Sequence, residues 1–369
     1  MLKNLNIKIY KEIDNELEKL WTNFEKNSFN FYFQTYQWQK YWFKQIKKYK
    51  NESISIYVAV VKSEERVLLI LPFCIRKIFF LKILSWSGFP FSDYNAPLIS
   101  KNFNFSRDNF DIIWKLILKE NKKNYNCIFL ENQPELIKNQ QNPFFSNLKT
   151  FEANIYLGIN LKNFSANKIN QLSDINYQKN RLRKMGDLKF SFVKNKNEKK
   201  KVLKFIIKNK ITQYKKTNAW NVFEINAYKK FFIQCNLKLN TNLSYLTLDK
   251  KIIAAHSGYI YDKTFYYLFP TYDFDYKKYS PGKILLHYLI ENCVEKKLNY
   301  FDFTIGSEDY KRNWFNNKMK SCMTLKSIDT IGLLYILFIN FKILMKSLNI
   351  KNNFLKITYN KIKSSVTKS

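Results

Sequence analysis

The stretch YFDFTIGSEDYKRNW, residues 300–314, joins a short apolar run to a group of ionisable side chains. Asp302 interrupts the apolar run, and a carboxylate at a buried strand position needs a partner. Gly306 permits a sharp turn at the end of the predicted strand, which is where layered α/β folds place their sites. Four side chains of different chemistry follow within two turns: Glu308, Tyr310, Lys311 and Trp314. This combination predicts acid–base chemistry, and an ion pair of Lys311 with Glu308 or Asp302 that joins strand to turn is compatible with it.

A second candidate is His256, in the middle of the predicted strand KIIAAHSGYIY. Strand alternation places His256, Gly258 and Ile260 on one face, and the small neighbours leave room beside the strand. Imidazole titrates near neutral pH, which suits a general base or a hydrogen-bonding partner of a substrate. A histidine satisfied inside a core is an equally good interpretation.

The segment YSPGKIL, residues 279–285, predicts an anion site at the start of a helix. Ser280 suits the N-cap and Pro281 the first helical position. Three amides would then point toward a bound phosphate: those of Gly282, Lys283 and Ile284. The lysine among them adds positive charge, whereas simple helix capping explains the same residues without a ligand.

The elements that position these residues recur in both halves of the chain. The first half is predicted to contain strands at 5–10, 53–61, 67–77 and 125–132, helices at 11–26 and 108–121, an aromatic turn entering a helix at 31–46, and an ordered loop at 84–99. After a polar linker around 138–150, the second half is predicted to contain helices at 167–186, 197–216, 225–238 and 280–297, strands at 189–195 and 300–304, and three strands over 243–273 with turns at 249–250 and 262–263. The recurrence predicts two related halves of an α/β (α+β) layered fold. We therefore expect domains at 1–150 and 151–325, followed by a basic amphipathic tail at 326–369.

The tail has its own composition. Residues 331–348 are strongly apolar, and from 325 to 369 the chain has eight lysines against one acid, Asp329. Two interpretations remain open: a helix packed on the second domain, or an amphipathic segment lying on an anionic membrane surface. No uncharged run reaches the roughly 18 residues of a spanning helix, and the N-terminus lacks the apolar region of a signal peptide.

The net charge of +34 favours anionic partners such as phosphates, coenzymes or membrane surfaces. Almost all the basic residues are lysines, and no helix-turn-helix, zinc-finger or RNP pattern is present, so nucleic-acid binding is not the expected main function. The five cysteines are scattered and form no CxxC pair. This argues against a disulfide framework or a metal site and predicts a cytoplasmic protein, with a possible peripheral position on the inner membrane face.

Four motifs stand in a characteristic order: AAHSG (254–258), PTYD (270–273), YSPG (279–282) and FDFTIGSEDYKRNW (301–314). In this order they resemble the C-terminal core of the CelD-type acetyltransferases. These are GNAT-fold proteins associated with cellulose and exopolysaccharide biosynthesis, and they are related to the FemAB aminoacyltransferases. The similarity extends over about residues 30–325 and includes FQTYQWQKYWFKQI, WSGFPFSDYNAPLI and NRLRKMGDLKF.

The resemblance implies two GNAT-like domains in tandem, the first degenerate, with mixed and mostly antiparallel sheets flanked by helices. It implies acyl transfer from acetyl-CoA, or another acyl-CoA, to a hydroxyl or amine of a sugar or polysaccharide precursor, without a metal. Two alternatives remain: FemAB-like aminoacyl transfer from charged tRNA to a cell-envelope precursor, and a non-catalytic basic scaffold bound to the membrane through the tail.

The resemblance also implies roles for residues. His256 or Glu308 would be the base, and Tyr310 would protonate the leaving thiolate. Lys311 would place positive charge near the oxyanion or bind the acceptor, and Asp302 would orient Lys311 or His256. The coenzyme pyrophosphate would lie on the helix start at Gly282, Lys283 and Ile284. Substrate binding is expected from Asp93 and Tyr94, in a cleft between domains, and from Tyr272 and Trp314.

Overall fold

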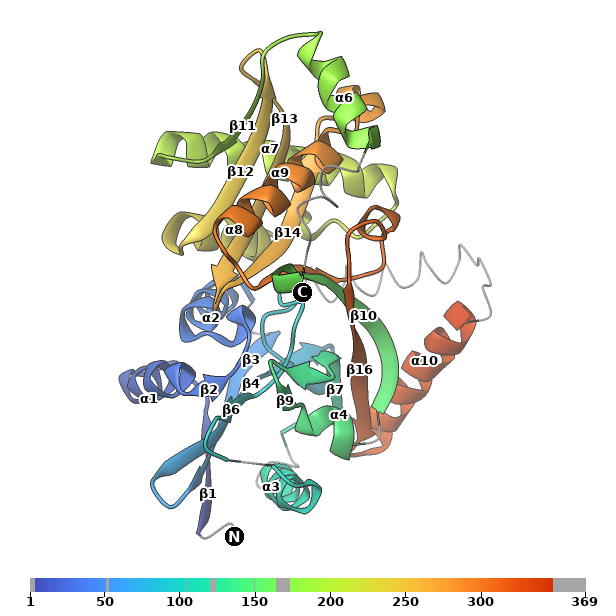
Figure 1. The fold of residues 1–369 in the computed structure, drawn as a ribbon. Helices are drawn as coiled ribbons and strands as arrows, with labels where there is room; N and C mark the ends of the chain where they lie inside the picture. The colour runs from blue at the N-terminus through green and yellow to red at the C-terminus, as the bar shows by residue number, and fades with distance from the viewer. Residues whose placement is uncertain are drawn as a thin grey trace. The chain divides into compact units, whose positions relative to one another are not determined.

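The computed structural model describes residues 4–50, 53–103, 105–119, 124–148, 150–163 and 173–347. The chain divides into two compact units (Figure 1). The first unit comprises Met1–Asn154, Ile225–Tyr228 and Met319–Ser369, and the second comprises Ile155–Glu224 and Lys229–Lys318. The functional division at 150 and 325 stays a prediction.

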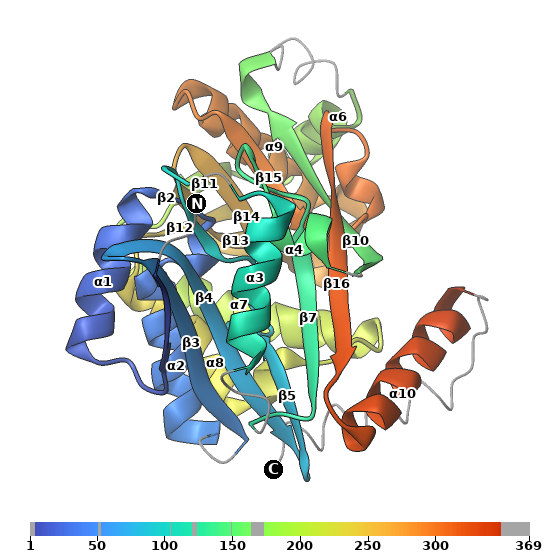
Figure 2. The same cartoon turned by 90° about the horizontal axis from the view of Figure 1, so that it is seen from below.

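In the first unit the strands follow the order β1 (Leu5–Tyr10), β3 (Ile54–Ser63), β4 (Arg66–Ile78), β5 (Leu81–Trp86), β7 (Cys127–Pro134) and β16 (Asn317–Ser327). Neighbours are antiparallel except β5 and β7, which are parallel. Short pairs are added by β2 (Ser28–Phe29) with β6 (Leu98–Ser100), and by β8 (Leu136–Ile137) with β9 (Gln140–Gln141). Helices α1 (Asn15–Lys26) and α2 (Tyr36–Lys50) lie on one side of the strands, and α3 (Arg107–Lys119) lies on the other, near α4 (Pro143–Asn147) (Figure 2).

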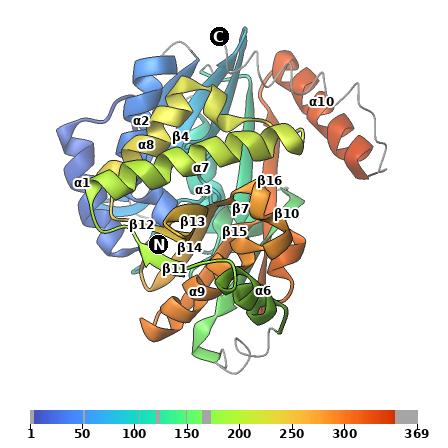
Figure 3. The same cartoon turned by 90° about the horizontal axis from the view of Figure 1, so that it is seen from above.

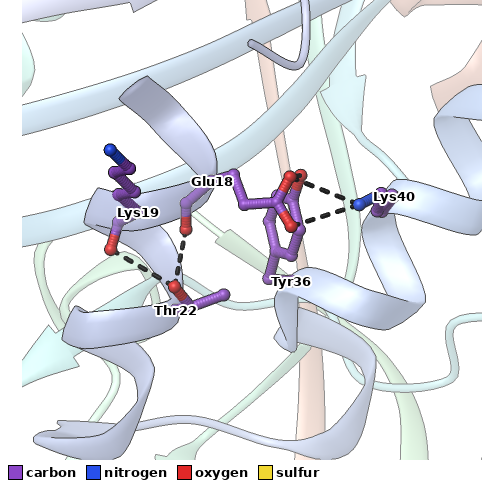
Figure 4. A network of polar contacts seen from close by, with 5 residues as sticks. All are labelled: Glu18, Lys19, Thr22, Tyr36 and Lys40. Carbon is purple, nitrogen blue, oxygen red and sulfur yellow. Dashed lines mark hydrogen bonds and ion pairs between the residues drawn. The ribbon is translucent and has the colours of Figure 1, made fainter. Parts of the chain in front are cut away.

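Glu18 joins α1 to α2 (Figure 4). Its carboxylate accepts a hydrogen bond from the Tyr36 hydroxyl at 2.8 Å and pairs with the Lys40 ammonium at 3.1 Å. Both contacts lower the pKa of Glu18, with the Tyr36 hydrogen bond the larger cause. The aromatic segment predicted to enter a helix at 31–46 is therefore confirmed as a packed helix entry, with Tyr36 fully buried.

In the second unit the strands follow the order β11 (Leu188–Phe192), β12 (Thr241–Leu248), β13 (Lys251–Tyr261), β14 (Thr264–Tyr272), β15 (Tyr300–Ile305) and β10 (Thr150–Asn160). Neighbours are again antiparallel except one parallel pair, β14 with β15. Helices α7 (Lys196–Lys216) and α8 (Asn226–Lys238) lie on one side, and α9 (Pro281–Glu295) with α6 (Ser173–Arg183) lies on the other (Figure 3). Aromatic and aliphatic side chains under α9 form the core on that side.

The two units repeat one order of strands, helices and strand directions, which confirms the predicted two related halves of an α/β layered fold. Each unit contains one strand whose partner lies far away in the sequence: β16 pairs with β7, and β10 pairs with β15. The sequence-based prediction missed both of these strands, and it also assigned β5 partly to a loop. The helix expected at 167–186 is found at Ser173–Arg183, and residues 164–172 lie outside the described part.

The predicted turns at 249–250 and 262–263 are confirmed. Asp249, Lys250, Asp262 and Lys263 all have φ between 45° and 68°, as two-residue hairpin turns of type I′ require. These turns fix the registers β12–β13 and β13–β14, and so decide which side chains of β13 lie under α9.

The apolar tail forms α10 (Thr330–Ser347). Tyr335, Ile336 and Ile339 pack against a cluster that includes Leu81 and Phe129, so α10 belongs to the first unit. Of the two interpretations of the tail, a helix packed on the second domain is therefore wrong. Among the described helices, none combines the length and the apolar character needed to span a bilayer. The remainder of the predicted tail, 348–369, lies outside the described residues.

Candidate active site

The parallel pair β14–β15 is short. The two strands pair only from Thr264 with Tyr300 to Tyr266 with Asp302, although both continue further. Beyond this point each strand contains a residue with positive φ, Phe269 at 46° and Thr304 at 58°. The polar residues of the stretch 300–314 therefore follow the place where β14 and β15 cease to pair.

Asp302 stabilises the irregular end of β15. Its side chain is 3% exposed, and Oδ1 accepts a hydrogen bond from the Thr304 amide at 2.7 Å. Positive φ is costly for a β-branched residue, so this hydrogen bond offsets part of the cost at Thr304. The buried carboxylate thus has a local structural role at the strand end.

Lys311 holds the turn that follows. Its side chain is 2% exposed, and Nζ donates to the Ile305 and Gly306 carbonyls at 3.1 and 3.3 Å and pairs with Glu308 Oε2 at 2.7 Å. An ammonium group has three donors, and these three acceptors match them. The predicted ion pair with Glu308 is present, and it closes the turn at Gly306, where φ is 110°. Lys311 therefore offers an oxyanion its charge and no spare N–H.

Five ionisable side chains of the second unit are electrostatically linked: Lys210, His256, Tyr267, Glu308 and Tyr310. Burial lowers the pKa of the Lys210 ammonium to about 8, and the Glu308 carboxylate acts in the opposite direction. Burial, together with the charge of Glu308, raises the pKa of Tyr310. A group poised near neutral pH beside a phenol that keeps its proton is the pattern of an acid–base site.

His256 is completely buried among aromatic rings. Its ring stacks on Tyr267, with centroids 4.7 Å apart and planes at 8°, and lies 5.4 Å from the ring of Phe265. Nδ1 lies 3.5 Å from Ser244 Oγ, and Nε2 has no hydrogen-bond partner among the described residues. Burial, and secondarily the charge of Lys210, lowers the pKa of His256 to about 3. The imidazole is therefore neutral and a weak base.

The room predicted beside His256 is filled by the imidazole itself. A Cβ added at Gly258 would lie 2.6 Å from His256 Cε1 and 2.3 Å from the Tyr266 carbonyl oxygen. We expect Gly258→Ala to lower the free energy of unfolding by about 2 kcal/mol or more, because a backbone atom cannot rotate away. Urea unfolding measures this. Gly282→Ala is the control, since its Cβ would meet only Tyr272 Cδ1 at 3.4 Å. Equal stability of the two variants would contradict the close packing.

The predicted anion site at the start of α9 has fewer free backbone amides than expected. Ser280 is the N-cap residue, but it has φ of 50° and its side chain makes no capping hydrogen bond. The amides of Lys283 and Ile284 both donate to the Ser280 carbonyl, at 3.0 and 3.2 Å. Of the three amides predicted to bind a phosphate, only that of Gly282 makes no hydrogen bond within the first turn, as far as the described residues show. Lys283 Nζ adds positive charge, 3.8 Å from an Asp174 carboxylate oxygen.

The predicted substrate-binding residues fall in different places. Asp93 and Tyr94 belong to the first unit, and Tyr94 is 2% exposed within its aromatic core. Trp314 is 3% exposed and forms part of the core under α9, whereas Tyr272 is half-buried beside Gly282. Their roles in substrate binding stay predictions.

The sequence-based prediction missed Lys210. The helix that carries it contains many lysines, so one more did not stand out. A signal was nevertheless present, because Lys210 follows buried Ile206 and Ile207 at spacings of four and three. It therefore continues the apolar stripe of α7, where an ammonium group loses part of its hydration.

No group of three or more His, Cys, Asp or Glu side chains within the described ranges is placed to hold a metal ion. All five cysteines are buried and unpaired with one another.

Comparison with known proteins identifies the fold. Residues 170–312 match the family model described as an acetyltransferase (GNAT) domain. No curated protein sequence matches the chain. A conserved protein of unknown function from Bacteroides thetaiotaomicron VPI-5482 is structurally similar, with a TM-score of 0.54 and 12% identity over 86% of this chain and 99% of that chain. FemX is similar with a TM-score of 0.54 and 10% identity over 85% of this chain and 96% of that chain.

A tandem GNAT protein from the clavulanic acid biosynthesis pathway has a TM-score of 0.49 and 11% identity, over 88% of this chain and 99% of that chain. At such low identities, structural likeness concerns the fold alone. The match at 170–312 contains α6 to β15 and the turn that follows β15, and its residues include Lys210, His256 and Glu308. The second unit thus carries an acetyltransferase (GNAT) domain, both units have a GNAT-like order of strands and helices, and the chain is an acyltransferase.

Proposed function

We propose that the second unit transfers an acetyl group from acetyl-CoA to a hydroxyl or amine of a sugar or polysaccharide precursor. The main support is electrostatic: Glu308, in the turn after β15, interacts both with Lys210 on α7 and with Tyr310. The choice of acceptor rests on the resemblance of residues 254–314 to the CelD-type acetyltransferases. We propose a cytoplasmic location, with a peripheral contact of the first unit to the membrane.

Lys210 is the proposed base. In its neutral form it accepts the proton of the acceptor hydroxyl or amine while the acceptor atom bonds to the acyl carbon. Acetyl-CoA supplies the acetyl thioester, whose carbon–sulfur bond breaks. Tyr310 donates its proton to the departing sulfur, and the Lys210 ammonium restores that proton through solvent. Lys210 replaces His256 and Glu308 as the preferred base because the His256 imidazole is too weak a base and the Glu308 carboxylate is paired with Lys311.

The other predicted site residues have supporting roles in this proposal. Asp302 and Lys311 fix the strand end and the turn from which Glu308 and Tyr310 project. His256 stacks on Tyr267 and keeps the centre of the sheet closed to water. The Gly282 amide and the Lys283 ammonium would hold the pyrophosphate of acetyl-CoA.

Titration calorimetry with acetyl-CoA tests the donor. We expect binding at roughly micromolar strength, lost in Gly282→Glu, because a carboxylate at the helix start repels the pyrophosphate. Gly282→Ala is the matched control and is expected to retain binding, since its Cβ fits. Absence of heat with acetyl-CoA and longer acyl-CoAs, from folded protein, would refute the coenzyme as donor.

Aminoacyl transfer from charged tRNA is the second candidate, and one observation favours it. A pocket of about 660 Å³ beside α7 is rich in lysine and is lined in part by Lys201, Lys208, Lys216, Lys250 and Lys251. Such a surface suits an RNA backbone. Binding of charged tRNA together with no binding of acyl-CoA would favour this function over the first.

A further inference from the structure

Helix α10 lies beside β16 in Figure 2, and its side chains Tyr335, Ile336 and Ile339 pack on the first unit. Six large apolar side chains on it are between 42% and 65% exposed: Ile331, Leu333, Leu334, Leu337, Phe341 and Leu344. Four of these recur at spacings of three and four and form a single stripe along the helix, which is about 27 Å long. Contiguous exposed apolar surface of this kind marks an interaction site.

A second element presents apolar side chains beside α10. Phe79 and Phe80, in the turn between β4 and β5, are 70% and 76% exposed. Their neighbours Ile78 and Leu81 pack in the same cluster as Tyr335 of α10, so this turn and the helix meet in one region of the first unit. We call Phe79, Phe80 and the six exposed α10 side chains the apolar surface.

Lysines predominate among the charged residues that border the apolar surface in the sequence, and the acid Asp329 stands just before α10. Lys77 and Lys82 flank the phenylalanine pair, and α10 contains Lys342 and Lys346 but no acid. From residue 330 to the end, the chain has seven lysines and no Asp or Glu. An apolar stripe bordered by lysines matches an anionic lipid surface, where apolar side chains enter the headgroup boundary and each lysine contributes attraction.

A second copy of the chain fits the apolar surface less well than an anionic lipid surface does. Pairing two α10 helices through the exposed stripe would bring lysines together with no carboxylate of α10 to offset them. A bilayer rich in anionic lipid supplies that missing negative charge.

We propose that the apolar surface docks the first unit on an anionic lipid bilayer. The proposal extends the membrane contact expected of the tail to a second, independent element, the Phe79–Phe80 turn. It does not depend on the acyl-transfer chemistry of the second unit, and its test measures lipid binding alone, so the two proposals can fail separately.

The test is flotation of the full-length protein with vesicles. Mixed phosphatidylglycerol–phosphatidylcholine vesicles are compared with pure phosphatidylcholine, at low and high salt. We expect binding to the anionic vesicles only, weakened by salt. Two double variants, Phe79→Ser with Phe80→Ser and Leu334→Gln with Leu337→Gln, are each expected to reduce binding at least about tenfold. Ile112→Gln, an exposed apolar position on α3, is the matched control and should bind as wild type.

The replaced side chains are exposed, so the variants should fold, and circular dichroism checks this. No binding of folded wild-type protein to anionic vesicles would overturn the proposal, as would double variants that bind like wild type. Sedimentation velocity provides a further criterion. A wild-type dimer that the double variants dissociate, without vesicle binding, would assign the apolar surface to a second copy.

Discussion

Lys210→Met is expected to lower kcat for acyl transfer by about 10²–10⁴-fold, the usual contribution of a positioned general base. The physical reason is that burial lowers the pKa of Lys210 to about 8, so a useful fraction is neutral near physiological pH. A protonated amine cannot accept a proton. The wild-type rate should therefore fall as the pH drops below about 8 and level off above it, and the residual rate of Lys210→Met should lack this dependence. Thiol release from acetyl-CoA with a panel of amino and nucleotide sugars measures both.

Two further variants test whether the base is Lys210 itself. Lys204→Met alters an exposed lysine of the same helix and should leave the rate and its pH profile unchanged. Glu308→Gln should move the profile to lower pH, because the Glu308 carboxylate raises the pKa of Lys210 in the wild type. If Lys210→Met kept the wild-type profile while Glu308→Gln lost all activity, Glu308 would be the base and Lys210 would not.

Lys311→Met is expected to reduce the free energy of unfolding by about 2–4 kcal/mol. The ammonium group satisfies the carbonyls of Ile305 and Gly306 and one oxygen of Glu308. Methionine has similar length but no donor, so the carbonyls at the end of β15 would lose their partner. Urea unfolding followed by far-ultraviolet circular dichroism gives the free energy.

Arg312→Gln is the matched control for Lys311. Arg312 is the next residue, and its ion pair with Asp309, at 3.1 Å, lies between side chains that are 72% and 88% exposed. Exposed ion pairs contribute little, so this variant should change stability by less than about 0.5 kcal/mol. If Lys311→Met were as stable as Arg312→Gln, water would be replacing the ammonium group, and the turn would not depend on it.

Local patterns were sufficient to predict the elements around the site. The alternating segments of β12, β13 and β14, with their two Asp-Lys turns, were placed correctly because each turn and each strand pair is formed by residues close together in the chain. The end of β15 at Gly306 and the ion pair of Lys311 with Glu308 were predicted for the same reason.

Other features depend on distant residues and could not be predicted in this way. Strand β16 pairs with β7, almost 190 residues earlier, and its sequence alternates polar and apolar residues only weakly. Lys210 became a candidate only when the fold placed it near Glu308, which is 98 positions later. The weak basicity of His256 likewise follows from rings supplied by another strand.

The position of β16 bears on how the chain folds during synthesis. The ribosome releases β1 to β7 early. The strand that pairs with the other edge of β7, away from β5, is β16, which emerges near the end of synthesis. Until then that edge keeps unsatisfied amides and carbonyls that other chains can pair with. Translation of nearly the whole polypeptide must therefore precede the pairing of β7 with β16, and a nascent chain stalled before residue 317 would be prone to aggregation.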